Sequence, residues 1–425
     1  MIDRVVAPAF RQVEQIELIH AKPQVLSNGV KTFVIAGGEQ DMVRLEFIFN
    51  NVSWDAAKPL QAFATHTMLN DGTSEFTATQ IAEKVDYYGA FLTTEYGYDQ
   101  STVTLLTLSK HLASTLPIVK AIISDSVFPE RELQTFITNQ KQKLSINLEK
   151  NSFLSRRIFN KALFGNTLYG YDAQASDYDR LTQQELKDHF YRTYQPQNCT
   201  IIASGQVTDD IIKQIDTHFG KNWNNTTAGI TENQFEFKKT KGSDHYVEKP
   251  EALQSAIRLG QLSVGRSHPD YAGLQVLGTI LGGYFGSRLM ANIREDKGYT
   301  YGIGSALTSF KNTGCFFIAS EVGVAVCQAT LDEIKKELII LQQELVPVEE
   351  LSLVRNYMLG SILGSLENTL SHADKFKNIY FFGLGYDYYD RYINTVKTIA
   401  SEELLRLAQQ YLNFDEMEKV VVGKK

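Results

Sequence analysis

The chain has 425 residues, 43% of them apolar and 21% charged, which is typical of a globular protein with more than one domain. Its 42 basic and 49 acidic residues give a net charge of −7, so the composition excludes the basic surplus of a nucleic-acid-binding protein. No stretch reaches the roughly 20 apolar residues that span a bilayer, which argues against a membrane partner. Residues 1–8 lack the pattern of a signal peptide. Because Cys199, Cys315 and Cys327 form neither a metal spacing nor an even disulfide set, we expect a cytoplasmic protein with reduced thiols.

The first half of the chain predicts a strand, a helix, and then a second helix and strand. Residues 43–49 alternate between apolar and polar side chains, which predicts a half-buried strand. Residues 60–69 form a mostly apolar helix. A capping box at Thr182 and Glu185 begins a helix that runs to residue 194, and the strand 200–203 follows.

The second half repeats this order about 215 positions later, which indicates a duplicated fold. The expected elements are the strand 256–262, the helix 271–281, the helix 401–411 and the strand 420–422. Between them, apolar residues recur three and four positions apart and predict a long amphipathic helix; these are Leu331, Ile334, Leu338, Leu341 and Leu345.

Strands and helices in this order favour an α+β fold of two homologous lobes, each an antiparallel-rich sheet covered by helices. The polar segment 221–244 is rich in turn-forming residues and is the best linker. We therefore expect an N-terminal lobe of residues 1–220, a linker of 221–244 and a C-terminal lobe of 245–425.

The most specific motif spans residues 285–301, in which Ser287-Arg288-Leu289 precedes Arg294 and Gly298 separates Arg294 from Tyr301. This run resembles the second-half signature of the inverzincin zinc peptidases, the pitrilysin, insulysin and mitochondrial processing peptidase relatives. In that family a zinc site on an H-x-x-E-H helix of the first half works with an arginine and a tyrosine seven residues apart in the second. The resemblance covers nearly the whole chain and implies two lobes that close like a clamshell.

The zinc half of that site is degenerate in this sequence. Counted back from Gly72-Thr73, the histidine positions hold Phe63 and Thr67, and the position of the general base holds His66. The third ligand position falls on Asn147, although Glu149 lies close by. We expect no metal in this chain and interpret His66 as a hydrogen-bonded residue of a packed helix, with a remnant ligand as the alternative.

Arg294 and Tyr301 are the catalytic residues that the resemblance implies. A guanidinium and a phenol aimed at the attacked carbonyl stabilise the negative charge that develops as it becomes tetrahedral. In the alternative interpretation, Arg294 pairs with an acid such as Glu295 and Tyr301 is a core aromatic residue.

Substrate in this family is an extended peptide that joins a sheet edge. The matching segment contains Phe91, Leu92 and Thr93, although an ordinary interior strand fits equally well. Gly282 and Gly283 follow an apolar helix rather than a strand, which favours a hinge or a close backbone approach beside the substrate over a phosphate-binding loop.

The leading hypothesis is a non-catalytic subunit that lends Arg294 and Tyr301 to a homologous partner carrying H-x-x-E-H, with zinc in that partner and self-association when it is alone. A second hypothesis is an inactive peptide-binding or scaffolding homologue. A third is a zinc peptidase with non-standard ligands.

Overall fold

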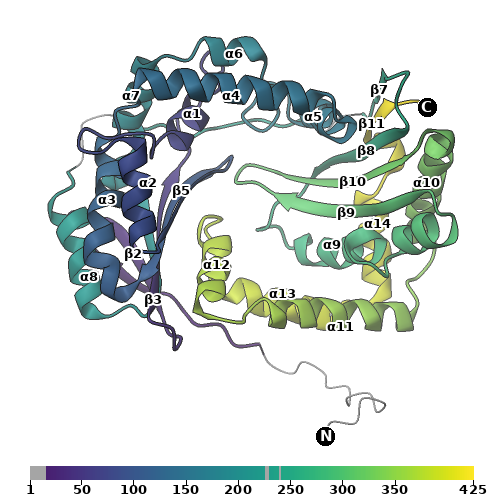
Figure 1. Cartoon of the computed structure of the whole chain (residues 1–425). Coiled ribbons are helices and arrows are strands. Elements are labelled where there is room, and N and C mark those ends of the chain that lie inside the picture. Colours follow the sequence, from purple (N-terminus) through teal and green to yellow (C-terminus); the bar gives the residue numbers. More distant parts are fainter. Residues whose placement is uncertain (1–15, 225–228, 239–240) are drawn as a thin grey trace, which may run out of the picture.

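Two β-sheets organise the chain in the computed structural model, which describes residues 16–224, 229–238 and 241–425 (Figure 1). Residues 1–8, considered above for a signal peptide, and residues 225–228 and 239–240 of the expected linker lie outside the described part. Each sheet forms a lobe with helices packed on it, and most strand pairs are antiparallel. The α+β class expected from the sequence is confirmed.

The first sheet comes from the N-terminal half. Its strands in spatial order are β1 (Lys22–Val25), β2 (Lys31–Ala36), β6 (Cys199–Gly205), β3 (Met42–Asn50), β5 (Gln100–Leu108) and β4 (Phe91–Tyr96). Within the described residues, β4 pairs with β5 alone and is an edge strand. The strand that contains Phe91, Leu92 and Thr93 is therefore an edge rather than an interior strand.

The second sheet comes from the C-terminal half and has the same plan. Its strands in spatial order are β7 (Asp244–Glu248), β11 (Glu418–Gly423), β8 (Gln254–Ser263), β10 (Gly314–Gly323) and β9 (Thr300–Ser309). In the described part of this sheet β9 is an edge strand, as β4 is in the first. Each predicted strand lies within an observed one, which supports the duplication inferred from the sequence.

Helices surround both sheets. Those of the N-terminal half are α1 (Gln61–Thr67), α2 (Ala78–Tyr87), α3 (Leu112–Asp125), α4 (Glu130–Leu148), α5 (Asn151–Phe164), α6 (Ala175–Asp179), α7 (Gln183–Thr193) and α8 (Asp209–Ile215). Those of the C-terminal half are α9 (Tyr271–Gly278), α10 (Cys327–Gln343), α11 (Val348–Gly364), α12 (Thr369–Tyr380), α13 (Asp387–Thr398) and α14 (Ser401–Tyr411), with the π-helical turns η4 (Thr279–Gly283) and η5 (Met290–Asp296).

One face of each sheet is covered by helices of its own half. Because side chains alternate along a strand, Leu45 and Phe47 of β3 share one face, where they join a core with helices α1, α3 and α7. Ile257 and Leu259 of β8 do the same with α9, α10 and α14. Burial of each such large side chain stabilises the fold by about 1.5–3 kcal/mol.

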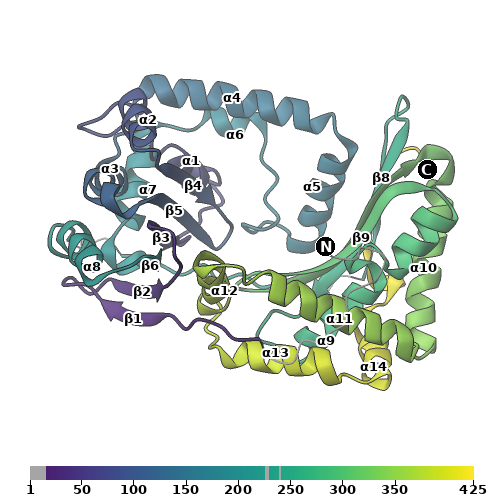
Figure 2. The same cartoon turned by 60° about the horizontal axis from the view of Figure 1, so that its bottom comes forward.

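The other face of each sheet is covered by a helix from the opposite half. Phe159 of α5 packs with Val420 and Val422 of the second sheet, and Figure 2 shows α5 beside β8. Phe376 of α12 packs with Ile48 of the first sheet, beside which α12 stands in Figure 1. The two lobes are thus joined by an exchange of helices as well as by the chain connection.

This exchange corrects one sequence prediction. Strands β3 and β8 were expected to be half-buried, but most of their residues on both faces are buried. The reason is that α12 and α5 cover the faces that the alternation left for solvent. The apolar residues next to each other in Phe47-Ile48-Phe49 are the signal of two-sided burial.

Three smaller points concern the helices and cysteines. Leu331, Ile334, Leu338 and Leu341 are buried in the core, as predicted, whereas Leu345 lies beyond the end of α10 and is half exposed. All three cysteines are free, as the sequence predicts, and the structure shows that all three are buried. In the part of the chain that the structure describes, no helix is long and apolar enough to cross a membrane.

Candidate functional site

His66 lies in the core of the first lobe, on the helix α1 that resembles a zinc helix. Its side chain is fully buried, the hydroxyl of Tyr194 lies 2.7 Å from Nδ1, and the carbonyl oxygen of Thr102 lies 3.1 Å from Nε2. Because a carbonyl only accepts, Nε2 carries the proton and Nδ1 accepts from the tyrosine. Burial lowers the pKa of His66 to about 4, so the ring is neutral at pH 7. Both nitrogens are engaged, which is the hydrogen-bonded interpretation favoured above.

The two positions where the family has histidines do not offer zinc ligands. The ring of Phe63 packs against Tyr96 and Phe136, with centroids 5.5 and 5.9 Å away. The Thr67 hydroxyl donates to the carbonyl oxygen of Phe63 one helical turn earlier, at 2.8 Å. An aromatic cluster and a backbone-bonded hydroxyl thus stand where a metal would need two imidazoles.

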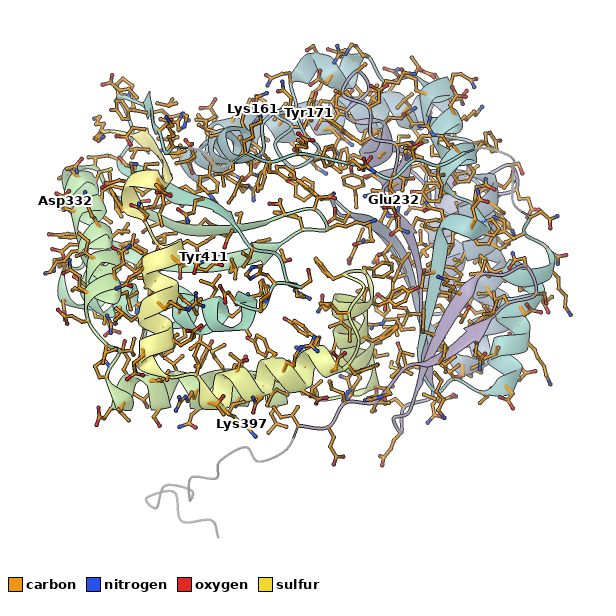
Figure 3. All side chains as sticks on the ribbon, turned by 180° about the vertical axis from the view of Figure 1, so that it is seen from behind. Lys161, Tyr171, Glu232, Asp332, Lys397 and Tyr411 are labelled. Atoms are coloured by element: carbon orange, nitrogen blue, oxygen red, sulfur yellow. The ribbon has the colours of Figure 1, made fainter. Side chains whose placement is uncertain are left out.

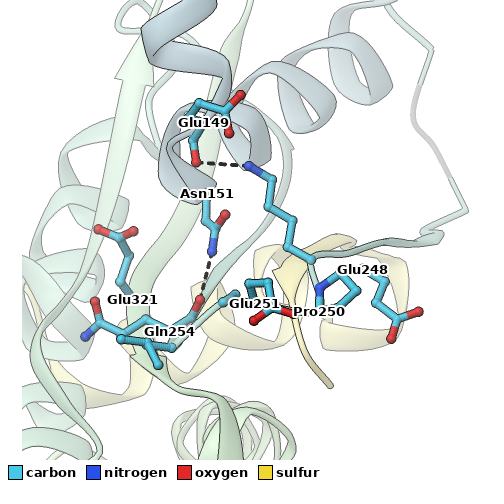
Figure 4. A pocket seen from close by; sticks show the side chains of 10 residues that line it. Glu149, Asn151, Glu248, Pro250, Glu251, Gln254 and Glu321 are labelled. Carbon is cyan, nitrogen blue, oxygen red and sulfur yellow. Dashed lines mark hydrogen bonds between the residues drawn. The ribbon is translucent and has the colours of Figure 1, made fainter.

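The position of the third ligand is also unsuitable. Asn147 lies near the end of α4, eleven residues after Phe136 and therefore about 16 Å along the helix axis from the residue that contacts Phe63. Its side-chain oxygen accepts from Lys150. Glu149 follows α4 and lines a surface pocket with Glu248 and Glu251, where its backbone carbonyl accepts from Lys249 (Figure 4). The structure does not bring Asn147 or Glu149 to Phe63.

The residues present therefore do not fit a zinc ion. A catalytic zinc needs three protein ligands and an open position, and α1 supplies an aromatic ring, a hydroxyl and a histidine with both nitrogens engaged. Among the described residues, no group of three or more His, Cys, Asp or Glu side chains is placed to hold a metal.

Arg294 lies in the second lobe on the π-helical turn η5, a rare conformation that is frequent at functional sites. Its guanidinium carbon lies 4.5 Å from the centroid of the Phe285 ring, a cation–π contact. Among the described residues it forms no ion pair, whereas its neighbour Lys297 pairs with Glu333 at 3.6 Å. The structure therefore does not show the alternative in which Arg294 pairs with Glu295.

Tyr301 is the second residue of the edge strand β9 and is 94% exposed, so it is not a core aromatic residue. The pairing of β9 with β10 shifts register between Ile303 and Thr300, a β-bulge that interrupts the alternation of side chains beside Tyr301, while Ile303 is buried in one core with Ile293 of η5. Gly298, with φ of 65°, makes the turn between η5 and β9. The arginine and the tyrosine thus lie on consecutive elements, η5 and β9, which one tight turn connects.

Chemically, Arg294 and Tyr301 offer hydrogen-bond donors to an anion. A guanidinium that has no carboxylate partner among the described residues and an exposed phenol can both donate hydrogen bonds. Such a pair can stabilise developing negative charge on a substrate brought to it, but it contains no nucleophile or general base.

The predicted substrate contacts lie on different elements. Phe91 of the edge strand β4 is 67% exposed. Gly282 lies in η4, and a Cβ there would come 2.6 Å from the backbone nitrogen of Ser305 on β9. Gly282 therefore serves the close backbone approach expected from the sequence. The contact between Phe285 and Arg294 was not foreseen, because a ring at the start of the motif gives no sign of where it folds back.

The chain is similar to proteins of one family. Residues 180–358 match the family model described as the peptidase M16 inactive domain. A Bacillus subtilis protein named uncharacterized zinc protease YmxG is 26% identical over 82% of this chain and 84% of its own length. A Helicobacter pylori protein named non-peptidase homolog YmxG is 21% identical over 84% and 83%.

Solved structures share the fold. The crystal structure of a peptidase M16 inactive domain from Pseudomonas fluorescens superposes with a TM-score of 0.86 at 22% identity, covering 95% of this chain and 98% of that one. The resemblance to the zinc peptidase family and the two-lobed architecture expected from the sequence are confirmed.

Proposed function

We propose that this chain, a relative of the M16 peptidases, is the non-catalytic subunit of a heteromeric zinc peptidase. It would supply Arg294 and Tyr301 to the active site of a homologous partner that carries H-x-x-E-H and the zinc. The observation that carries the proposal is the pairing of two features: an exposed Tyr301 with an Arg294 that forms no ion pair among the described residues, and an α1 helix without a ligand set.

The chemistry requires hydrogen-bond donors aimed at the carbonyl oxygen of the substrate. As the attacked carbonyl becomes tetrahedral, its oxygen gains charge, and preorganised donors stabilise the transition state more than the ground state. The guanidinium of Arg294 lies over the ring of Phe285, and this contact leaves its N–H groups available to donate to a substrate.

Peptide binding belongs to the same proposal. The edge strand β4 has backbone groups on one side that no described strand pairs, and a peptide in extended form can add to such an edge. Backbone hydrogen bonds there would hold a peptide with little sequence selection.

The test is turnover by a mixed complex of this chain with an H-x-x-E-H homologue encoded by the same genome. Arg294→Ala and Tyr301→Phe should each lower kcat on the order of 10²-fold while leaving assembly intact. Arg391→Ala and Tyr191→Phe are matched controls, since Arg391 is an exposed arginine on α13 and Tyr191 is half exposed on α7. Unchanged turnover in both test variants would remove this role.

A second candidate function is an inactive peptide-binding or scaffolding homologue. It is favoured by the match to an inactive domain and by the non-peptidase name of the Helicobacter pylori relative. Both candidates share the coarser description of a catalytically inactive M16 homologue. They differ in one outcome, because a scaffold binds peptide but gives no turnover with any zinc-bearing partner.

A further inference from the structure

A cavity of about 580 Å³ lies where the two lobes meet beneath α5. Its walls come from the β4–β5 turn of the first sheet, from α5, and from β8, β9 and β10 of the second sheet. Figure 1 shows the β4–β5 and β9–β10 hairpins pointing at one another. They touch there: the ring centroids of Tyr98 and Phe310 are 5.6 Å apart, and the backbone N–H of Lys311 donates to Asp99 at 2.8 Å. Beside this contact Lys311 also pairs with Glu232, which Figure 3 labels.

The cavity is lined by three arginines and by no Asp or Glu, and we call it the arginine pocket (Arg156, Arg157 and Arg258). Arg157 is neutralised by Asp172 and also donates to a backbone carbonyl. Arg156 is exposed, its guanidinium lies over Phe153 at 5.4 Å, and it has no ion pair within the described residues. Two of the three positive charges thus lack a counter-ion in the described structure.

Arg258 is the most informative of the three. It projects from the middle of β8, with its guanidinium carbon 4.2 Å from the ring of Phe317 and 5.5 Å from the ring of Phe159. Its Nε is buried without a hydrogen-bond partner. Burial lowers the pKa of Arg258, as does the charge of Arg156, and a bound anion would oppose both effects. An arginine has five N–H donors, and among the described residues none of those of Arg258 has an acceptor.

At the equivalent interface in the first lobe, the charged side chains are paired with one another. There α12 covers the first sheet, and Arg44 of β3 pairs with Asp374 at 2.8 Å and with Glu46 at 3.1 Å. Lys377 of α12 pairs with Glu46 at 2.5 Å. Charges of both signs balance where α12 meets its sheet, whereas only arginines line the cavity where α5 meets the other. The missing negative charge is therefore specific to the second interface.

We propose that the arginine pocket binds the carboxylate of a peptide, with Arg258 and Arg156 as its ligands. Two guanidiniums suit a planar carboxylate, which each can meet with paired N–H donors. The aromatic walls, which include Phe310 and Phe317, suit the apolar stem that carries it. The edge strand β4 ends at Tyr96 in the wall of the cavity, so a peptide added to that edge is led to the pocket. This inference rests on the proposed peptide-binding function and adds a preference for acidic peptides.

The experiment measures binding of the full chain, without any partner, to labelled decapeptides by fluorescence anisotropy. One peptide has a single Glu and an amidated C-terminus, a second has Gln in its place, and a third has Gln with a free C-terminal carboxylate. The Glu peptide should bind about tenfold or more tightly than its Gln counterpart. The third peptide shows whether a terminal carboxylate also serves.

Variants locate the effect. Arg258→Gln and Arg156→Gln should each remove the preference for Glu, whereas Arg391→Gln, on the exposed face of α13, should keep it. Because Arg156 is exposed, its variant tests the pocket even where Arg258→Gln disturbs folding. A preference for Glu that survives in Arg156→Gln would overturn the assignment of the pocket.

Two further outcomes separate this inference from the function on which it rests. Equal binding of the Glu and Gln peptides would overturn the carboxylate pocket and leave peptide binding standing. Inorganic phosphate that binds in an Arg258-dependent way, with no carboxylate preference among peptides, would overturn it in favour of a small-anion site. Turnover by the mixed complex, which depends on Arg294 and Tyr301, is measured separately.

Discussion

Acidification should destabilise the first lobe, because two histidines are buried in their neutral form. Burial lowers the pKa of His66 to about 4 and that of His189 to about 3, with Arg192 adding to the effect at His189. A histidine in the unfolded chain titrates near 6.5. The unfolded state therefore binds more protons between pH 6.5 and 4, and stability is present above this window and is lost as the pH falls through it.

The size follows from the difference between the folded and unfolded pKa values. Between pH 7 and pH 5 each histidine should lower the free energy of unfolding by about 2 kcal/mol, or on the order of 4 kcal/mol together. Asp71, whose pKa is raised to about 6 by burial and by Glu132, acts in the opposite direction. It is partly exposed, so solvent screening reduces its share to about 1 kcal/mol or less.

The assay is urea unfolding of the full chain at pH 7, 6 and 5, extrapolated to zero denaturant. The test variant is His66→Gln, whose amide can still donate to the carbonyl of Thr102 and accept from Tyr194 but does not titrate. The wild type should lose about 2 kcal/mol more than this variant between pH 7 and 5. The same loss in both proteins would refute the assignment of His66 as a buried neutral residue.

Three further predictions concern the second lobe and the metal. Gly282→Ala should lower the free energy of unfolding by about 1–3 kcal/mol, because its Cβ would come 2.6 Å from the nitrogen of Ser305. The control Gly278→Ala should not lower it in this way, because its Cβ meets no atom within 4 Å. Equal losses in the two variants, measured by urea unfolding, would contradict this. Phe285→Ala should change the free energy of unfolding by less than about 1 kcal/mol but should reduce turnover of the mixed complex, because Arg294 loses the ring that it contacts. Full turnover in this variant would speak against a role of Phe285 in positioning Arg294. Excess zinc should leave the thermal unfolding midpoint of the isolated chain unchanged, since a metal that bound the folded state would raise it by several degrees.

Much of the fold follows from local sequence, because alternation and capping act over a few residues. The strands β3, β6, β8 and β11 and the helix α7, which begins after its cap at Thr182, were all predictable in this way. The exchange of α5 and α12 was not, because it depends on which distant surface each apolar helix face meets.

The candidate site divides in the same manner. Arg294 and Tyr301 were found by their spacing, and the degenerate zinc helix by the residues that replace its ligands. The arginine pocket was missed because its members come from α5 and β8, which lie about 100 residues apart. A charge inside the apolar strand Ala256-Ile257-Arg258-Leu259 was the one available signal, since a buried arginine requires a partner.

The division of one active site between two chains is tested most directly by titrating this chain into a fixed concentration of its H-x-x-E-H homologue and measuring the hydrolysis of a peptide. Turnover should rise from near zero with the homologue alone to a plateau at one to one. A rate that stays flat across the titration, or a homologue that is fully active by itself, would contradict a contribution of Arg294 and Tyr301 to the shared site.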